Sequence, residues 1–325
     1  GGASSGVAIR VSKVCQDKGV VFMATVSAAN ATTDTEGHRH TFRTCYNAWM
    51  GAKALGTFLK RNFAGKKYFY VVADYSWGRS AEESIRTFSN TEDRDLHKST
   101  YTTFPGATEE EFRNKVRLAK IREADVLVLA QFGNDMTLAV RAAEELDLKD
   151  SMQIVVPILE LSMCEGAGPE AMEGIIGTSD WNWRVPSAYG FTRGQKFVDC
   201  FWLRYGRYPC WGAATAYTGL WQYKEAVERA GTFAASSVIR ALEGHRFTLL
   251  KDEQEWRDFD HQNMQTVYLV RCRNAADVLS SVNSQDYFEN IDCLSGPLVV
   301  RTPAEWKKIR KSAKLPDFLE KLEGE

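Results

Sequence analysis

The sequence predicts an α/β fold built on a doubly wound, mainly parallel sheet. Patterns typical of strands and of helices alternate along the first half of the chain, at the spacing of βαβ units. Residues 125–130 read Asp-Val-Leu-Val-Leu-Ala, a continuous apolar run typical of a strand buried on both faces of a parallel sheet. With 325 residues, the chain is long enough for about two domains.

The expected elements follow one another from the N-terminus. A buried strand over 20–26 leads into a polar loop at 27–41. A helix over 45–63 comes next, because Trp49, Leu55 and Phe63 recur at helical spacing. Further strands are expected at 68–73, near Thr100, and at 125–130, 153–157 and 266–272. Further helices are expected to end near Phe88, to span 192–205 and 213–229, to end at Leu242 and to begin at Pro303.

Capping residues predict where several helices begin and end. Thr108 and Glu111 have the spacing of a capping box, in which each side chain accepts a hydrogen bond from the backbone amide of the other residue. Asn134 is expected to cap the following helix. Gly231 is expected to end the helix over 213–229, because glycine readily adopts the left-handed conformation found there.

The predicted topology indicates where a ligand binds. In doubly wound sheets, ligands bind at the carboxyl ends of the strands, near a topological switch point. The segments at these positions are 27–30, 74–77, 131–134 and 158–160. Residues 178–186 have no clear period and end in a proline, so we expect them to cross between two domains.

Charge and motifs argue against several classes of function. Lys and Arg number 41 and Asp and Glu 42, which gives no overall attraction to nucleic acid or to an anionic membrane. The chain contains no phosphate-binding loop, zinc-protease motif or nucleophile elbow. His38 and His40 lack a cysteine or carboxylate at ligand spacing, so no metal site is expected, and no cofactor or catalytic set is visible.

The seven cysteines leave the redox compartment open. No C-x-x-C motif occurs, which argues against a zinc ribbon or a thioredoxin-type site. Cys200 and Cys210 lie ten residues apart around a turn and could close a small disulfide loop. Buried free thiols are the favoured interpretation for most of the seven.

Five stretches, in this order and spacing, resemble segments of one protein family: they begin GGASSGVAIRVSKV, FRTCYNAWMGAKA, FPGATEEEFRNKV, YGRYPCWGAATAY and ALEGHRFTLLKDE. The family is the type I periplasmic binding proteins of the leucine/isoleucine/valine and amide/urea branch, the receptors of ABC importers. The resemblance implies two lobes, each a mainly parallel sheet flanked by helices, with the ligand cleft between them. It assigns 1–65 and 184–300 to the first lobe and 66–181 to the second, with 301–325 as a candidate to return to the second.

The resemblance also bears on the N-terminus. In the family the Gly-Ser-Ser turn follows about two βα units, whereas here it opens the chain. At ~30 residues per unit, on the order of 70 residues are expected to be missing from the first lobe, and a signal peptide with them.

Polar contacts to the ligand are implied at five positions. Ser4 and Ser5 match a turn whose hydroxyl and backbone amides hold a ligand carboxylate or amide oxygen. Ala28 and Asn30 match the strand end that offers partners to the same group. Glu160 lies near the family's acidic partner for an α-ammonium group, and an amino-acid ligand is favoured if this carboxylate faces the pocket.

Aromatic walls are implied at four positions. Trp77 and Tyr75 match the mouth of the second lobe, and Phe132 matches the loop after one of its strands. Trp181 lies in the crossover and could wall the pocket. Ordinary packing between the lobes is the competing interpretation of Trp77, Phe132 and Trp181.

The resemblance implies a non-enzymatic receptor that captures a small solute by hinge closure and presents it to an ABC permease. It would act as a monomer in the periplasm or outside the cell, associated with the membrane through the permease. An amino acid is the first expected ligand, and an aromatic or apolar carboxylate or amide the second. Two alternatives stay open: a cytosolic ligand-sensing regulator of the same fold, and an NAD-type enzyme on a doubly wound sheet.

Overall fold

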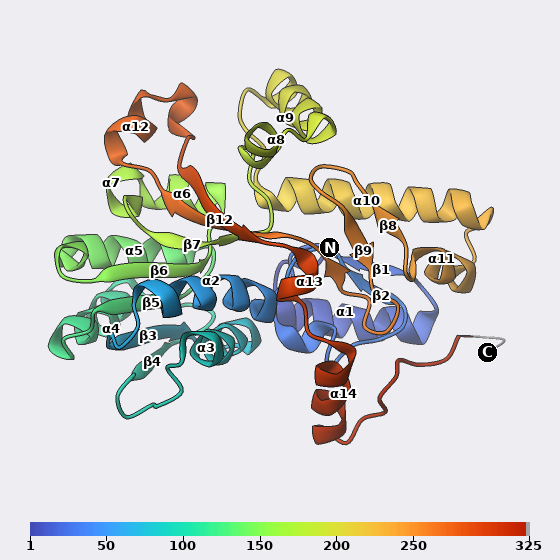
Figure 1. The fold of residues 1–325 in the computed structure, drawn as a ribbon, viewed down its shortest axis with the longest axis horizontal. Helices are drawn as coiled ribbons and strands as arrows, with labels where there is room; N and C mark the ends of the chain where they lie inside the picture. The colour runs from blue at the N-terminus through green and yellow to red at the C-terminus, as the bar shows by residue number, and fades with distance from the viewer. Residues whose placement is uncertain (323–325) are drawn as a thin grey trace.

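The computed structural model describes residues 1–322, which form two halves that lie side by side (Figure 1). The large-sheet half contains a seven-stranded sheet, and the small-sheet half contains a two-stranded and a three-stranded sheet. The N-terminus lies where the two halves meet (Figure 1). No helix within these residues is long and apolar enough to cross a membrane.

The large sheet is parallel except along one edge. Strands β4, β3, β5, β6 and β7 are parallel neighbours in that order, and β11 is antiparallel to both β7 and the edge strand β12. The strands are β3 (Tyr68–Ala73), β4 (Ser99–Thr102), β5 (Val126–Ala130), β6 (Gln153–Ile158), β7 (Ile176–Ser179), β11 (Val267–Cys272) and β12 (Phe288–Leu294).

Helices cover both faces of this sheet, as a buried parallel sheet requires. Alternate residues of β5 face opposite layers: Leu127 and Leu129 pack with Phe112 and Val140, whereas Val128 packs in a second cluster. The covering helices are α2 (Ala48–Asn62), α3 (Ser76–Ser89), α4 (Glu109–Ile121), α5 (Asn134–Glu145), α6 (Leu161–Ala167), α7 (Pro169–Met172) and α12 (Ala275–Ser280).

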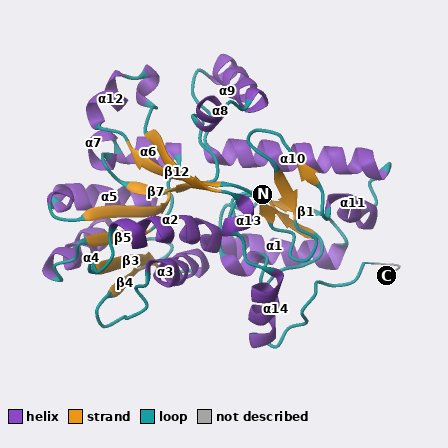
Figure 2. Cartoon of the chain, in the orientation of Figure 1, coloured by secondary structure: helices purple, strands orange, loops and turns teal. Residues whose placement is uncertain are grey.

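The small-sheet half is built from segments far apart in the sequence, which Figure 2 shows as long helices beside short strands. Parallel strands β1 (Phe22–Ala24) and β2 (Thr41–Arg43) lie beside α1 (Ser5–Lys18). The antiparallel sheet holds β8 (Arg246–Phe247), β9 (Gln254–Trp256) and β10 (Asn263–Met264). The other elements of the chain are η1 (Asn30–Thr32), α8 (Val185–Tyr189), α9 (Thr192–Tyr205), α10 (Trp211–Ala230), α11 (Ala235–Leu242), α13 (Gly296–Val299) and α14 (Pro303–Ser312), together with η2 (Leu148–Asp150) and η3 (Val282–Ser284), which pack in the large-sheet half.

The predicted caps have mixed outcomes. The Thr108 hydroxyl accepts the Glu111 amide at 3.2 Å, but the Glu111 carboxylate accepts the amide of Thr103 at 2.8 Å, so only half of the capping box forms. The prediction that Asn134 caps α5 is wrong, because Gly133 occupies the cap position and Asn134 is the first helical residue. Gly231 ends α10 at φ 65°, as predicted.

Strand pairing differs from the predicted division of the chain. Residues 184–300 were expected in the first lobe, but β11 and β12 hydrogen-bond into the large sheet. Helix α2, expected in the first lobe with 1–65, packs on the large sheet against β6, β7 and β11. Both differences arise because long-range pairing, rather than local pattern, decides which sheet a segment joins.

The C-terminal segment also differs from the expectation that it returns to the second lobe. The Trp306 indole donates to the backbone oxygen of Thr33 at 2.8 Å, and the Arg310 guanidinium donates to that of Asp34 at 2.7 Å. His38 pairs with Glu320 at 2.6 Å. These contacts tie the segment to the loop between β1 and β2, in the small-sheet half; of the expected range, 323–325 lie outside the described residues.

Candidate functional site

A gap between the two halves is lined by five of the nine residues that sequence reasoning selected. Side chains nearly fill the gap in this arrangement, because its cavity volume is about 10 Å³. A void of that size has room for about one water molecule. The lining residues are Ala3, Ser5, Val26, Ala28, Tyr75, Trp77, Phe132, Ile158 and Trp211.

Four aromatic rings form one continuous wall of this gap. Ring centroids lie 6.1 Å apart between Tyr75 and Trp77, 6.0 Å between Trp77 and Phe132, and 6.1 Å between Phe132 and Trp211. Trp77 is only 2% exposed, and the indole Nε1 atoms of Trp77 and Trp211 have no hydrogen-bond partner within residues 1–322. The four rings therefore offer a large apolar surface and carry two unpaired donors.

Three helices begin at the gap. Ser5 is the first residue of α1, Trp77 the second of α3 and Trp211 the first of α10. In none of them does the residue before the helix cap it through its side chain. Because first-turn amides lack partners inside the helix, these three ends present N–H groups and the positive ends of helix dipoles.

Ser4 and Asn30 do not line the gap. Ser4 precedes α1 and makes no side-chain capping bond. The Asn30 side chain accepts from the Trp49 amide at 2.9 Å and donates to the Ser84 hydroxyl at 3.1 Å. Asn30 thus connects η1 to α2 and α3, and its expected role as a ligand contact stays a prediction. Ser5 is better placed, with its hydroxyl oxygen accepting from the Ala29 amide at 3.2 Å.

Glu160 and Trp181 line an adjoining compartment, which shares Trp211 with the gap and is filled by its own side chains. Glu160 is buried and caps α6, since its carboxylate accepts the amides of Ser162 at 3.0 Å and Met163 at 3.3 Å. Burial and the nearby Glu160 carboxylate raise the pKa of the Cys210 thiol. The carboxylate faces neither solvent nor the gap itself, a case that the sequence did not anticipate.

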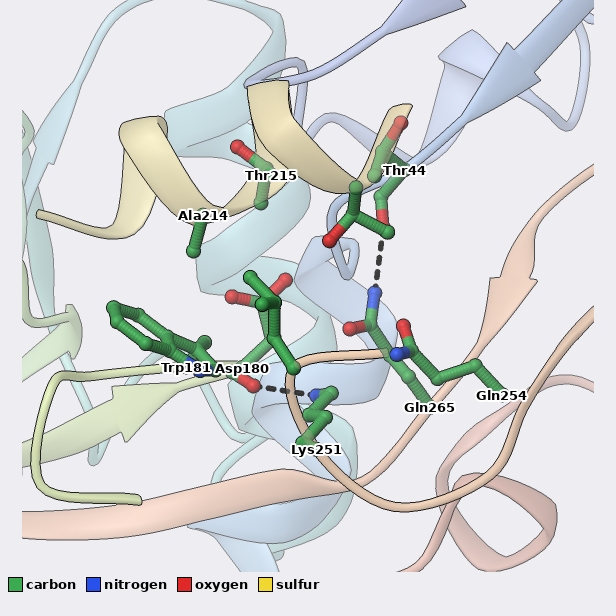
Figure 3. Close-up of a pocket in the computed structure, with 10 residues that line it drawn as sticks. Thr44, Asp180, Trp181, Ala214, Thr215, Lys251, Gln254 and Gln265 are labelled. Carbon is green, nitrogen blue, oxygen red and sulfur yellow. Dashed lines mark hydrogen bonds between the residues drawn. The ribbon is translucent and has the colours of Figure 1, made fainter. Parts of the chain in front are cut away.

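A third, polar compartment lies beyond Trp181 and has a cavity volume of about 20 Å³; we call it the polar chamber (Figure 3). In Figure 3 the Lys251 ammonium points to the backbone of Asp180, and the Gln265 amide points to that of Thr44. Its lining residues are all buried, and they are Thr44, Asp180, Trp181, Ala214, Thr215, Thr218, Leu250, Lys251, Gln254 and Gln265.

Two ionisable groups of the chamber are strongly perturbed. Burial raises the pKa of Asp180 to about 6, while Lys251, the Tyr46 amide and the Trp211 side chain favour the carboxylate. Burial also lowers the pKa of Lys251, and the Asp180 charge opposes that shift. Ionisable groups with shifted pKa values occur at functional sites and at structural sites alike. The hydrogen bonds of Asp180 and Lys251 therefore have to show which kind of site the polar chamber is.

Sequence reasoning missed Trp211 and most of the chamber. Trp211 follows Pro209 and Cys210 at the start of a helix, inside one of the stretches that carried the family resemblance, and that position was the available signal. The disulfide that Cys200 and Cys210 could have closed does not form, because all seven cysteines are free thiols. No group of three metal-ligating side chains occurs within residues 1–322.

The model of a family described as "Periplasmic binding protein" matches residues 1–277. The chain belongs to the periplasmic binding protein family. This confirms the family that the sequence resembles, and it makes the chain an extracytoplasmic solute receptor by family. Comparison with curated proteins finds no match for it.

Solved structures share the fold of this periplasmic binding protein. One from Burkholderia mallei is 19% identical, with a TM-score of 0.82, over 93% of this chain and 78% of its own. A leucine-, isoleucine-, valine-, threonine- and alanine-binding protein from Brucella ovis is 18% identical, with a TM-score of 0.75, over 92% and 77%. A solute-binding protein of an ABC transporter from Rhodopseudomonas palustris, solved with 3,4-dihydroxybenzoic acid, is 14% identical, with a TM-score of 0.78, over 93% and 78%.

Proposed function

We propose that this periplasmic binding protein captures a small aromatic carboxylate in the gap between its halves. The observation that carries the proposal is the convergence of three uncapped helix starts, those of α1, α3 and α10, on a gap walled by four aromatic rings. Helix N-termini hold anions through free amides and the dipole, and aromatic walls bury a flat apolar body.

The lining of the gap favours a carboxylate without an ammonium group. No acidic side chain is among the nine lining residues, so nothing at the gap pairs with a cation. Solved relatives include solute-binding proteins from R. palustris in complex with benzoate and with p-hydroxybenzoic acid, and also amino-acid-binding proteins. The rank of an aromatic carboxylate before an amino acid therefore rests on the lining of the gap.

An amino acid is the second candidate, and one observation favours it. The Glu160 carboxylate lies just behind Trp211, in the adjoining compartment. A movement of the Trp211 ring would open a path from the gap to this carboxylate, which could then pair with an α-ammonium group.

We further propose that the protein works outside the cytoplasm as a monomer and delivers its solute to an ABC permease at the membrane. Capture proceeds by closure of the two halves, without any change in the bonds of the solute. The family supports the extracytoplasmic receptor role, and the relatives named as ABC transporter proteins support the permease.

A thermal-shift panel tests the proposal. Benzoate, hydroxybenzoates, phenylalanine and leucine are compared with benzamide, which keeps the ring but lacks the charge. A solute at 100 times its Kd adds about 2.7 kcal/mol of stability. We expect the aromatic carboxylates to raise Tm by several degrees and benzamide to leave it unchanged. A shift with amino acids alone would replace the first candidate by the second, and no shift with any compound would overturn both.

A further inference from the structure

The chain crosses between the two halves at four places, and three of them meet at the polar chamber; the fourth, 295–302, leads from β12 to α14 in the small-sheet half. The first crossing, 44–47, joins β2 to α2, the second, 180–184, joins β7 to α8, and the third, 265–266, joins β10 to β11. Thr44, Asp180 and Gln265 line the chamber, so each crossing contributes a wall. A change in the angle between the halves must rotate backbone at these places.

Buried polar groups connect the three crossings in pairs. The Lys251 ammonium donates to the backbone oxygens of Asp180 and, at 2.8 Å, of Thr266, which joins the second crossing to the third. The Gln265 amide donates to the backbone oxygen of Thr44 at 2.7 Å, which joins the third to the first. The Asp180 carboxylate accepts the Tyr46 amide at 3.0 Å, which closes the ring.

These connections lie in the interior of the protein. Lys251, Asp180 and Gln265 are 3%, 1% and 3% exposed, so breaking one of these bonds is costly unless a new partner replaces it. The buried Thr44 hydroxyl and the Asp180 Oδ1 atom have no partner within the described residues. Spare hydrogen-bonding capacity therefore exists for a second set of partners when the crossings rotate.

The chamber also communicates with the gap. Trp211 lines the gap, and its ring packs edge-to-face against Tyr46 with the centroids 5.9 Å apart. The Tyr46 amide in turn donates to the Asp180 carboxylate at 3.0 Å. A solute that packs against Trp211 therefore acts on a residue that contacts the ring of crossings.

We infer that Lys251, Asp180 and Gln265 form a clasp that sets the equilibrium between the arrangement seen here and a more open one. The inference rests on the proposed function, since it assumes a receptor that opens and closes. The three are positioning residues, because none of them lines the gap. The affinity of the protein for its solute falls when the binding-competent arrangement is less populated. A substitution that weakens the clasp should therefore lower the affinity although the clasp does not contact the solute.

The test is Lys251→Met, which keeps the unbranched stem and removes the ammonium. We expect the release rate of an aromatic carboxylate, followed by tryptophan fluorescence, to rise about tenfold, the scale of losing a charge-assisted hydrogen bond, with the association rate unchanged. Small-angle scattering without solute should show a larger radius of gyration than the unaltered protein.

Gln153→Met is the matched control, because the Gln153 amide joins the backbone oxygens of Ile154 and Gly174 within the large-sheet half alone. It should lower Tm without changing the release rate or the radius. Equal effects of the two variants on all three quantities would overturn the clasp. If Lys251→Met does not fold, Gln265→Leu replaces it with the same expectation. If the unaltered protein binds no solute, the proposed function fails, while the scattering comparison still decides whether the clasp holds the halves.

Discussion

The gap and the polar chamber are both buried between the same two halves, yet they are built from opposite materials. Four aromatic rings form much of the lining of the gap. Ser5 and Tyr75 contribute the hydroxyl groups among its lining residues. The chamber is lined mainly by amides, hydroxyls and the charged pair of Asp180 and Lys251. At the gap three helix starts have no side-chain cap, whereas in the chamber the Lys251 ammonium already bonds to backbone of the chain itself. The gap therefore leaves helix starts open to a solute, whereas the chamber uses its cation to join the halves.

Trp77→Ala removes one of the four rings that wall the gap, and it has the largest expected effect of these substitutions. Burying an aromatic side chain contributes about 2–3 kcal/mol, so affinity for the solute should fall about 100-fold. The free energy of unfolding should also fall by about 3 kcal/mol, because Trp77 is part of a buried cluster. Calorimetric titration measures the affinity, and denaturant unfolding measures the stability.

Trp202→Ala is the control for Trp77→Ala, because Trp202 lies on α9 against Tyr208 and does not line the gap. It should leave the affinity within about twofold of the unaltered protein. Equal losses of affinity in the two variants would show that the aromatic wall contributes no specific contact.

Asp180→Asn tests the chamber through the pH dependence of stability. Because the folded pKa of Asp180 is about 6 and the model value is 3.8, the folded state binds this proton more tightly than the unfolded chain. The stability that the protonated carboxyl contributes is complete below about pH 4 and is lost as the pH rises through 6. The difference of about two pKa units corresponds to about 3 kcal/mol.

The variant should therefore gain stability relative to the unaltered protein between pH 4 and 7, because Asn stays neutral and still accepts the Tyr46 amide. Denaturant unfolding at several pH values measures the gain. A stability difference that does not change with pH would show that the carboxyl titrates normally and that the chamber is wetter than its burial indicates.

Glu160→Gln has the smallest expected effect. It tests whether a carboxylate in the adjoining compartment contributes to binding in the gap. The amide oxygen still accepts the amides of Ser162 and Met163, so α6 stays capped and stability changes by less than about 1 kcal/mol. Affinity for an aromatic carboxylate should change less than about threefold, since the side chain does not line the gap. A large loss confined to amino acids would instead place an ammonium group beside Glu160.

Local sequence patterns predicted the three aromatic residues that the large-sheet half contributes to the gap, but they did not predict Trp211. Tyr75, Trp77 and Phe132 follow strands whose parallel neighbours are close in the sequence, so the rule for carboxyl ends of strands was enough to group them. Trp211 reaches the same gap from α10, after the chain has left the large sheet and returned. Its position depends on tertiary packing that no local period encodes.

The same reason explains the chamber and the lobe boundaries. Lys251 was an ordinary lysine in the sequence, and only the backbone oxygens of Asp180 and Thr266 give it a role. The strand at 266–272 was predicted, but its partners β7 and β12 were not. Asn30 was expected to contact a ligand, but its side chain hydrogen-bonds to Trp49 and Ser84. These two residues lie on helices that pack beside Asn30 only in the folded protein.

The antiparallel addition of β11 and β12 to the large sheet limits how the protein can be divided. A fragment that covers only 66–181 would end its sheet at β7, whose outer edge bonds to β11 in the intact chain. That edge would expose unpaired amide and carbonyl groups over Ile176–Ser179, a ready template for another chain. Expressed alone, such a piece should self-associate, and adding 267–294 as a separate peptide should restore a soluble, monomeric species.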